Sequence, residues 1–536
     1  MATMLKENNI ISKALLTIDQ YKGNLNNLKS SVLDNEYTPL NCPKYFSRTL
    51  IWKCCLITDS LSIHNWYTKL HDSRIIYHQL TKRNDMIIPW WVLDPESPFF
   101  QSKELSIHNK SNIKRTNSRT SRSTTTTTTN SVSINKIPLT RVSNIDDPLR
   151  SPNRSPVRST RSPTPSLPYQ ITEEDIELLQ IIVLDIERLF PGEQFYQSTN
   201  SITHKRHLIE ILYVWSRCNP QVGYKQGIHE ILGLFYKNLY QESIEIPRTN
   251  TISSDDVKIL NLYDINYLNH DLFTIFNKFI LTSGIISKFY ESEEVLWKTI
   301  ETFNVYLMKV DQLIHYNLLN KLKLESQLWI IRYFRLILLR ELGNDLETTT
   351  LLWDKLIASP QIHSYGGIPE LLMFMIIQLL IQLKTNLITC DFSESLSLLL
   401  HYPIQSHLHN QLTRHEFIGN LIKDSLKLYE RKANDLKLYE YGLKLNNIYN
   451  PNLRITMSYS GSARNSGEIS ATSSAPVSRS PTPLASNNTS NNSHNSHNNT
   501  SSSINHKHPD PKAEQLKFEK LRLEMRLKKK AQSMLR

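Results

Sequence analysis

Apolar residues between positions 169 and 450 recur three or four places apart along several stretches, the spacing of helices that bury one face. The stretch from Ile171 to Phe190 begins with Thr172 and, three residues later, Asp175, a pattern typical of a capping box. Pro191 and Gly192 then predict its end. The same periodicity predicts helices over 206–218, from about 225 to 240, over 326–342 and over 347–359. No segment alternates in the manner of a strand, so the pattern predicts an all-α fold.

Two long polar segments interrupt this pattern. Residues 101–168 are basic and rich in Ser, Thr and Pro, and residues 451–512 are rich in Ser and Asn. Neither holds enough apolar side chains to offset the entropy of ordering its backbone, so we expect both to be disordered. The predicted organisation begins with a partly helical lead-in at 1–41. A helical domain follows in two parts, 42–100 and 169–450, on either side of the insert. The chain then continues with the linker at 451–512 and a basic helix at 513–536.

The positive charge of the chain is concentrated in those polar segments. The formal net charge is +12, but 101–168 carries +9 and 452–536 carries +8, which leaves −5 for the remainder. Because these basic segments lack interleaved aromatic residues, nucleic-acid binding is disfavoured. Several Ser and Thr residues in these segments precede proline. This pattern predicts a proline-directed kinase as a partner, although a solvated linker with chance Ser-Pro pairs has the same composition. The residues that precede proline there are Ser151, Ser155, Ser162, Thr164, Ser480 and Thr482.

Several chemistries are excluded by missing motifs. None of the 13 glycines is followed by Lys and then Ser or Thr, so no Walker loop exists and we expect no nucleotide site in this chain. His229-Glu230 lacks the second histidine of a zinc protease motif, and no GxSxG is present. We expect neither a cofactor nor a metal. No apolar run approaches the ~20 residues that span a bilayer, which predicts an intracellular, cytoplasmic protein. The basic segment 513–536 is either a peripheral membrane or partner contact or a solvated helix.

Two polar sites stand out within the apolar helices. Asp185 and Arg188 are three residues apart, hence on one helix face, with Arg188 in the last turn before Pro191. The string Tyr224-Lys225-Gln226-Gly227 marks the turn into the next helix, where Gly227 permits a close backbone approach. Taken singly, the first is an ordinary ion pair and the second an ordinary junction.

Together these strings resemble the two signature motifs of the TBC domain, the Rab GTPase-activating fold. The matching pieces are Ile182-x-x-Asp185-x-x-Arg188 and, 38 residues after the arginine, Gln226 in Tyr224-x-Gln226-Gly227. Further landmarks agree in order: Arg48-x-x-x-Trp52, the segment from Trp329 to Arg335, and Leu352-Trp353-Asp354. The chain departs from the family at Leu189, where Thr is common, and at Ile228-His229, where Met-Asn is common. Within the family it looks most like the branch that includes fungal activators of Golgi and endosomal Rabs.

The resemblance implies a two-lobed helical domain that accelerates GTP hydrolysis by a Rab in vesicle trafficking. Arg188 would be the arginine finger and Gln226 would position the attacking water. Asp185 would orient Arg188, Tyr224 and Gly227 would shape the loop of Gln226, and Glu230 would support it. The Rab would bring GTP and magnesium, and the chain would act at Golgi or endosomal membranes. The alternative is a TBC-shaped scaffold that binds a Rab or a coat complex without catalysis.

Arg48 is also a supporting residue in this interpretation. The sequence leaves open whether it forms a structural ion pair or faces the GTPase. Trp52, Trp329 and Trp353 are predicted to be core aromatics.

Overall fold

The computed structural model describes residues 2–102 and 171–453, apart from gaps at 199, 247–252, 344 and 405–410. The predicted kinase sites, the predicted C-terminal helix, and all but the first two or three residues of the predicted insert and linker therefore lie outside the described residues. The described helices belong to one compact unit, Met1–Asn450.

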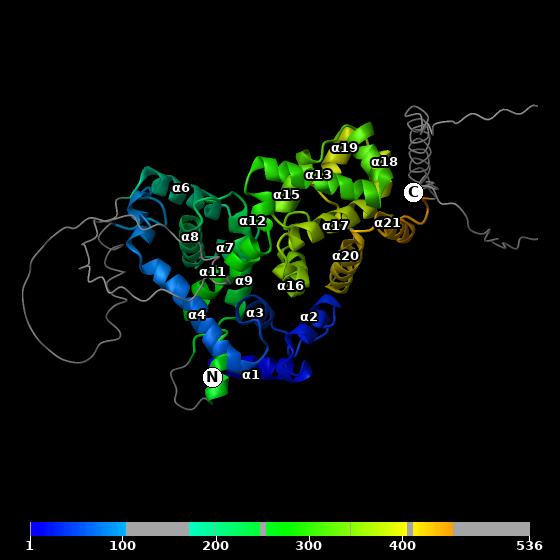
Figure 1. Cartoon of the computed structure of the whole chain (residues 1–536). Coiled ribbons are helices and arrows are strands. Elements are labelled where there is room, and N and C mark those ends of the chain that lie inside the picture. The colour runs from blue at the N-terminus through cyan, green and yellow to red at the C-terminus, as the bar shows by residue number, and fades with distance from the viewer. Residues whose placement is uncertain are drawn as a thin grey trace, which may run out of the picture. The chain divides into compact units, whose positions relative to one another are not determined.

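The regular secondary structure of the described part of the chain is helical (Figure 1). Its extended pairing consists of one isolated parallel bridge between Ile244 and Asp264. The prediction of an all-α fold is confirmed.

In Figure 1 most helices of the first half of the chain lie on the left of the unit and most of those of the second half on the right, but the helix at residues 25–33 lies beside helices of the second half. The helices of the first half are α1 Ala2–Gln20, α2 Leu25–Leu33, α3 Arg48–Lys53, α4 Ile63–Lys82, α6 Glu173–Glu187, α7 Gln194–Gln197, α8 Ser201–Cys218, α9 Ile228–Glu242, α10 Ser254–Asn261 and α11 Leu268–Asn277. In the second half they are α12 Ile285–Phe289, α13 Glu293–Val310, α14 Gln312–His315, α15 Gln327–Arg335, α16 Leu346–Ala358, α17 Gly367–Gln382, α18 Lys384–Thr389, α19 Phe392–Leu400, α20 Gln411–Arg431 and α21 Asp435–Tyr449. Short 3-10 or π turns are η1 Cys54–Thr58, η2 Asn84–Met86, η3 Trp90–Val92, η4 Ile265–Tyr267, η5 Lys278–Thr282, η6 Tyr316–Lys321 and η7 Pro360–His363.

The start of α6 follows the sequence pattern closely. The Thr172 side chain accepts a hydrogen bond from the Asp175 backbone, and the Asp175 carboxylate accepts one from the Thr172 backbone. This is the predicted capping box. The helix ends at Glu187 with Arg188 as its C-cap, just before Pro191.

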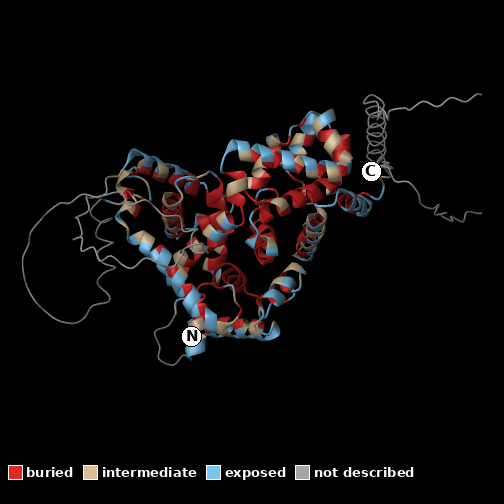
Figure 2. Cartoon of the chain, viewed as in Figure 1, coloured by how far each residue is buried: buried red, intermediate tan, exposed pale blue. Residues whose placement is uncertain are grey.

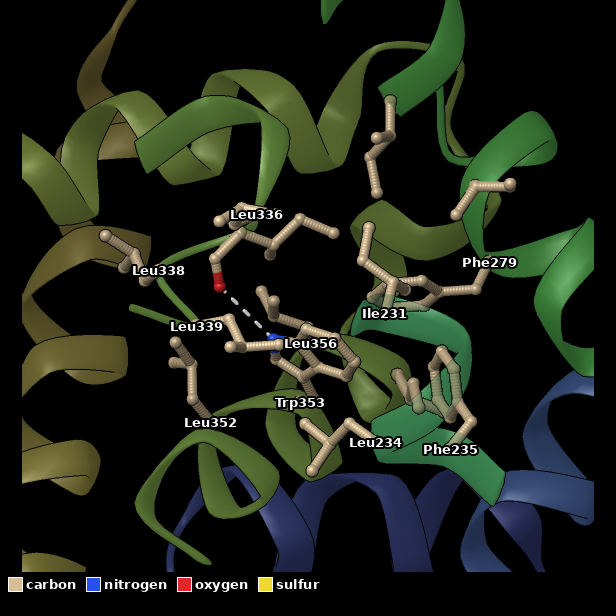
Figure 3. Packing of buried hydrophobic residues seen from close by; sticks show 14 of the residues in the cluster. Ile231, Leu234, Phe235, Phe279, Leu336, Leu338, Leu339, Leu352, Trp353 and Leu356 are labelled. Carbon is tan, nitrogen blue, oxygen red and sulfur yellow. Dashed lines mark hydrogen bonds between the residues drawn. The ribbon is translucent and has the colours of Figure 1, made fainter. Parts of the chain in front are cut away.

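The prediction of one helix over 326–342 is wrong in its second half. The structure ends α15 at Arg335, and the next residues turn with positive φ at Ile337 and Leu338, 51° and 61°. Both side chains are fully buried, and the Trp353 indole donates to the Ile337 carbonyl oxygen at 3.2 Å (Figure 3). Burial of this leucine-rich segment in the core therefore outweighs its helix propensity, which is a weak local preference.

The core runs continuously through α9, α16 and α17 (Figure 2). Trp52 packs edge-on against Phe235 with ring centroids 4.9 Å apart, and Phe235 lies 5.2 Å from Trp353. Trp52, Trp329 and Trp353 are each at most 1% exposed, so their prediction as core aromatics is confirmed. Because Trp52 precedes the insert and Phe235 follows it, the segments on either side of the insert share one core.

A buried ion triad joins α3, α4 and α11. The Asp271 carboxylate is fully buried and accepts hydrogen bonds from Lys53 at 2.7 Å and from Arg74 at 2.7 Å. Burial alone would raise the pKa of Asp271, but the two cations outweigh burial and lower it. The carboxylate is therefore charged in the folded protein.

Candidate functional site

Arg188 stands at the exposed end of α6. Its side chain is 64% exposed, whereas that of Asp185, one turn earlier, is 3% exposed. The Arg188 guanidinium donates to Asp185 Oδ1 at 2.5 Å. A buried carboxylate thus binds a terminal nitrogen of an exposed guanidinium.

Gln226 lies on the turn that leads into α9, and it is exposed. The next residue, Gly227, is the N-cap of α9 with φ 102°, a conformation that favours glycine. A Cβ on Gly227 would lie 2.9 Å from Leu336 Cδ2. The predicted close approach at Gly227 is therefore present, and its neighbour is the segment that follows α15.

The Asp185 carboxylate joins these two segments. The Tyr224 hydroxyl donates to Asp185 Oδ2 at 2.7 Å, so one carboxylate binds both Arg188 and the side chain two residues before Gln226. Burial first, and the Asp185 carboxylate second, raise the pKa of Tyr224 above its ordinary value, so the hydroxyl keeps its proton. The structure thus brings Asp185, Arg188 and Tyr224 into one hydrogen-bonded group beside the turn that carries Gln226.

His229 belongs to the same group, which the sequence did not reveal. Its Nδ1 lies 3.0 Å from the Tyr224 hydroxyl oxygen and 3.4 Å from Asp185 Oδ2. Burial lowers the pKa of His229, so the imidazole is neutral at physiological pH. A histidine in the first turn of an apolar helix carries no sequence signal for this role.

Glu230 anchors the opposite side of the α9 start. Its buried carboxylate accepts two hydrogen bonds from Arg340, at 2.9 and 2.7 Å. Arg340 lies in the segment that follows the end of α15. Leu336, which packs against Gly227, lies in the same segment. The break that the periodicity missed therefore supplies one contact to Gly227 and one to the first turn of α9.

Arg48 lies in a separate buried network. Its Nε donates to both oxygens of Asp354, at 3.1 and 3.0 Å, and its Nη1 donates to Asn238 at 3.1 Å. The Trp52 indole donates to the same Asp354 carboxylate at 2.8 Å. Of the two alternatives for Arg48, the structure favours the structural ion pair, because a side chain in this position is only about a tenth exposed.

Within the described ranges, no cluster of three or more His, Cys, Asp or Glu side chains has the arrangement needed to hold a metal ion. Over the same part of the chain, none of the helices has the length and apolar character to cross a membrane.

The all-α fold agrees with the resemblance to the TBC domain. Residues 152–388, which include Arg188 and Gln226, match the family model described as the Rab-GTPase-TBC domain. The resemblance to the TBC domain family is thus supported over this part of the chain.

Several known proteins are similar to this chain over part of its length. Mouse TBC1 domain family member 5 is 25% identical over 268 residues, which is 46% of this chain and 32% of that protein. GTPase-activating protein gyp1 of Schizosaccharomyces pombe is 24% identical over 225 residues, 41% of this chain and 40% of that protein. The crystal structure of the Ypt/Rab-GAP domain of Gyp1p aligns with 78% of this chain and 99% of that chain at 15% identity and a TM-score of 0.49. The chain thus spans about a third of the length of the first of these relatives.

Proposed function

We propose that this chain is a GTPase-activating protein for a Rab-type small GTPase, to which it supplies Arg188 and Gln226. The observation that carries the proposal is the single Asp185 carboxylate that binds Arg188 and the Tyr224 hydroxyl. It ties an exposed guanidinium to the turn of an exposed amide, so the two groups reach solvent from neighbouring helix ends.

The chemistry suits those two side chains. Negative charge on the transferred phosphoryl group is spread over its oxygens in the transition state, and an arginine supplied by a partner accelerates the reaction by ~10³ to 10⁵. This corresponds to roughly 4–7 kcal/mol of activation free energy. The planar guanidinium of Arg188 fits the phosphoryl oxygens, and the Gln226 amide can both donate to and accept from the attacking water.

In this proposal the substrate complex provides what the chain lacks. The Rab carries GTP and magnesium, and the chain completes the partner's active site. Asp185 and Tyr224 keep the two exposed groups in place before the partner arrives, so less ordering entropy is lost when the complex forms. The chain would act in the cytoplasm on Rabs at Golgi or endosomal membranes, in vesicle-mediated transport.

A panel of GTP-loaded Rabs tests the activity. The purified chain should accelerate phosphate release from at least one Rab, and Arg188→Ala, Arg188→Lys and Gln226→Ala should each lower kcat at least a hundredfold. Lys444→Ala, an exposed lysine on α21, is the control for the loss of a surface cation. Circular dichroism should show the same fold for all variants.

The outcomes separate two functions. If the wild-type chain stimulates a Rab and either Arg188 or Gln226 can be replaced without loss, the assigned roles are wrong. If the chain binds GTP-loaded Rabs without accelerating hydrolysis by any of them, it is a scaffold of the TBC shape.

A further inference from the structure

We propose that His229 is a positioning residue of this site, which holds the Tyr224 hydroxyl and thereby the turn that presents Gln226. The proposal rests on the function proposed above, and it adds a residue to which the motif resemblance assigns no role. His229 lies at the second position of α9, is 4% exposed, and faces the Asp185 carboxylate across the Tyr224 hydroxyl.

The hydrogen bonds define which atom carries each proton. Tyr224 has one hydroxyl proton, and its 2.7 Å bond to the charged Asp185 carboxylate uses that proton, because a carboxylate is only an acceptor. In the 3.0 Å contact with His229, the Tyr224 oxygen must then accept, so Nδ1 carries the imidazole proton. The result is a directed chain in which His229 donates to Tyr224 and Tyr224 donates to Asp185.

A neutral donor is well suited to this position. The charged groups that act on His229 are Asp185 and Arg188 from α6, the neighbouring Glu230, and Arg340 from the segment after α15. A permanent cation 3.4 Å from Asp185 would compete with Arg188 for the same carboxylate. A neutral Nδ1–H satisfies the Tyr224 oxygen and leaves the negative charge of Asp185 to Arg188.

The contact matters because Gln226 is itself exposed and is held in place through its neighbours. Gln226 precedes Gly227, and the backbone of glycine has a rotational freedom that other residues lack. The Tyr224 side chain is the tether between the Gln226 turn and α6. Displacement of a catalytic group by about 1 Å can cost ~10²-fold in rate, so loss of the donor that fixes Tyr224 should reduce turnover more than binding.

The chain offers a matched pair of substitutions. The side-chain nitrogen of asparagine is as many bonds from Cα as histidine Nδ1, so His229→Asn can donate the same hydrogen bond. His229→Leu fills similar space and has no donor. A role in packing alone would be met by leucine as well as by asparagine, whereas a role as donor requires asparagine.

Two measurements on the full chain test the proposal. With a Rab that the wild type stimulates, His229→Leu should lower kcat about tenfold or more at a nearly unchanged KM, and His229→Asn should stay within about threefold of the wild type. In a Tyr224→Phe background, His229→Leu should have no further effect, because the shared hydrogen bond is already gone. Hydrogen exchange should be faster at amides 222–227 in His229→Leu, and restored in His229→Asn.

Each failure has its own signature. If the wild-type chain stimulates no Rab, the proposed function fails, and the exchange measurement still decides whether His229 holds the turn. Unchanged exchange at 222–227 in His229→Leu overturns the inference whatever the activity. So does wild-type kcat in His229→Leu, or equal loss in the Asn and Leu variants. If His229→Leu does not fold, His229→Asn in the presence and absence of Tyr224 supplies the comparison, and any effect of His229→Asn that persists in Tyr224→Phe contradicts the inference.

Discussion

Replacement of Gly227 by alanine should impair activity far more than stability. Gly227 has φ 102°, and an alanine there carries a strain of about 1–3 kcal/mol. The added Cβ meets only Leu336 Cδ2 closely, at 2.9 Å, and the end of a leucine side chain can move aside. Against a typical stability of about 5–15 kcal/mol, the domain should remain folded. The strain is relieved most easily by rotation of the peptide that joins Gln226 to Gly227, and this rotation displaces the side-chain amide of Gln226. We therefore expect kcat to fall ~10²-fold.

Gly284→Ala is the control, because it has the opposite balance. Gly284 also has a positive φ of 86°, but its Cβ would lie 2.6 Å from the backbone nitrogen of Gly366 and 2.9 Å from Gly366 Cα. Backbone atoms cannot move aside without separating the turn before α12 from the turn before α17. We expect the strain and the overpacking together to cost about 2–6 kcal/mol. Turnover per folded molecule should be unchanged.

The assay combines thermal unfolding, followed by circular dichroism, with single-turnover GTP hydrolysis well below the unfolding transition. Gly284→Ala should show the larger drop in Tm and Gly227→Ala the larger drop in kcat. The reasoning would be refuted if Gly227→Ala kept full turnover, or if its loss of turnover only matched its loss of folded protein.

Further predictions concern the core, the pH dependence and the insert. Asp271→Asn leaves two buried cations without their carboxylate and should cost about 3–5 kcal/mol in chemical denaturation, whereas Asp255→Asn, in an exposed pair, should cost under about 1 kcal/mol; equal effects would contradict the buried triad. Burial, and then His204 and Arg206, lower the pKa of His207 to about 4. Its contribution to stability is therefore complete above its unfolded pKa of about 6.5 and is lost as pH falls toward 4, by up to about 3 kcal/mol. The pH dependence of the unfolding free energy should flatten in His207→Asn, and an unchanged profile would reject this origin. Deletion of 105–165 should leave soluble protein with wild-type GAP turnover, and insoluble protein would show that the insert is structural.

The sequence predicted best what depends on local chemistry. Two features of α6 were predicted in this way: the capping box at Thr172 and the end of the helix before Pro191. Each involves only residues that are close in sequence, and each is found in the structure. The ion pair of Asp185 and Arg188 also follows from helical spacing. Its burial does not, because the sequence alone reads the pair as an ordinary surface contact, whereas the Asp185 side chain is almost fully enclosed.

What the sequence could not predict depends on tertiary contacts. The predicted helix through 342 breaks after Arg335 because the following leucines fit the core only with a turned backbone. That turn delivers Arg340 to Glu230 and Leu336 to Gly227, contacts between residues more than a hundred positions apart. The role of His229 is hidden for the same reason, since its partner Asp185 lies on another helix. The assignment of Arg188 and Gln226 as catalytic groups stays a prediction from the family resemblance.

The network around Asp354 has a consequence for synthesis of the chain. Arg48 and Trp52 find their buried carboxylate 306 and 302 residues further on, so α3 has no stable place until most of the polypeptide has left the ribosome. The cost of closing so long a loop grows only with the logarithm of its length, which makes an insertion between the partners inexpensive once the contacts form. Cleavage by a protease within 105–165 should accordingly leave two fragments that co-purify, since Trp52 of the first fragment packs against Phe235 of the second.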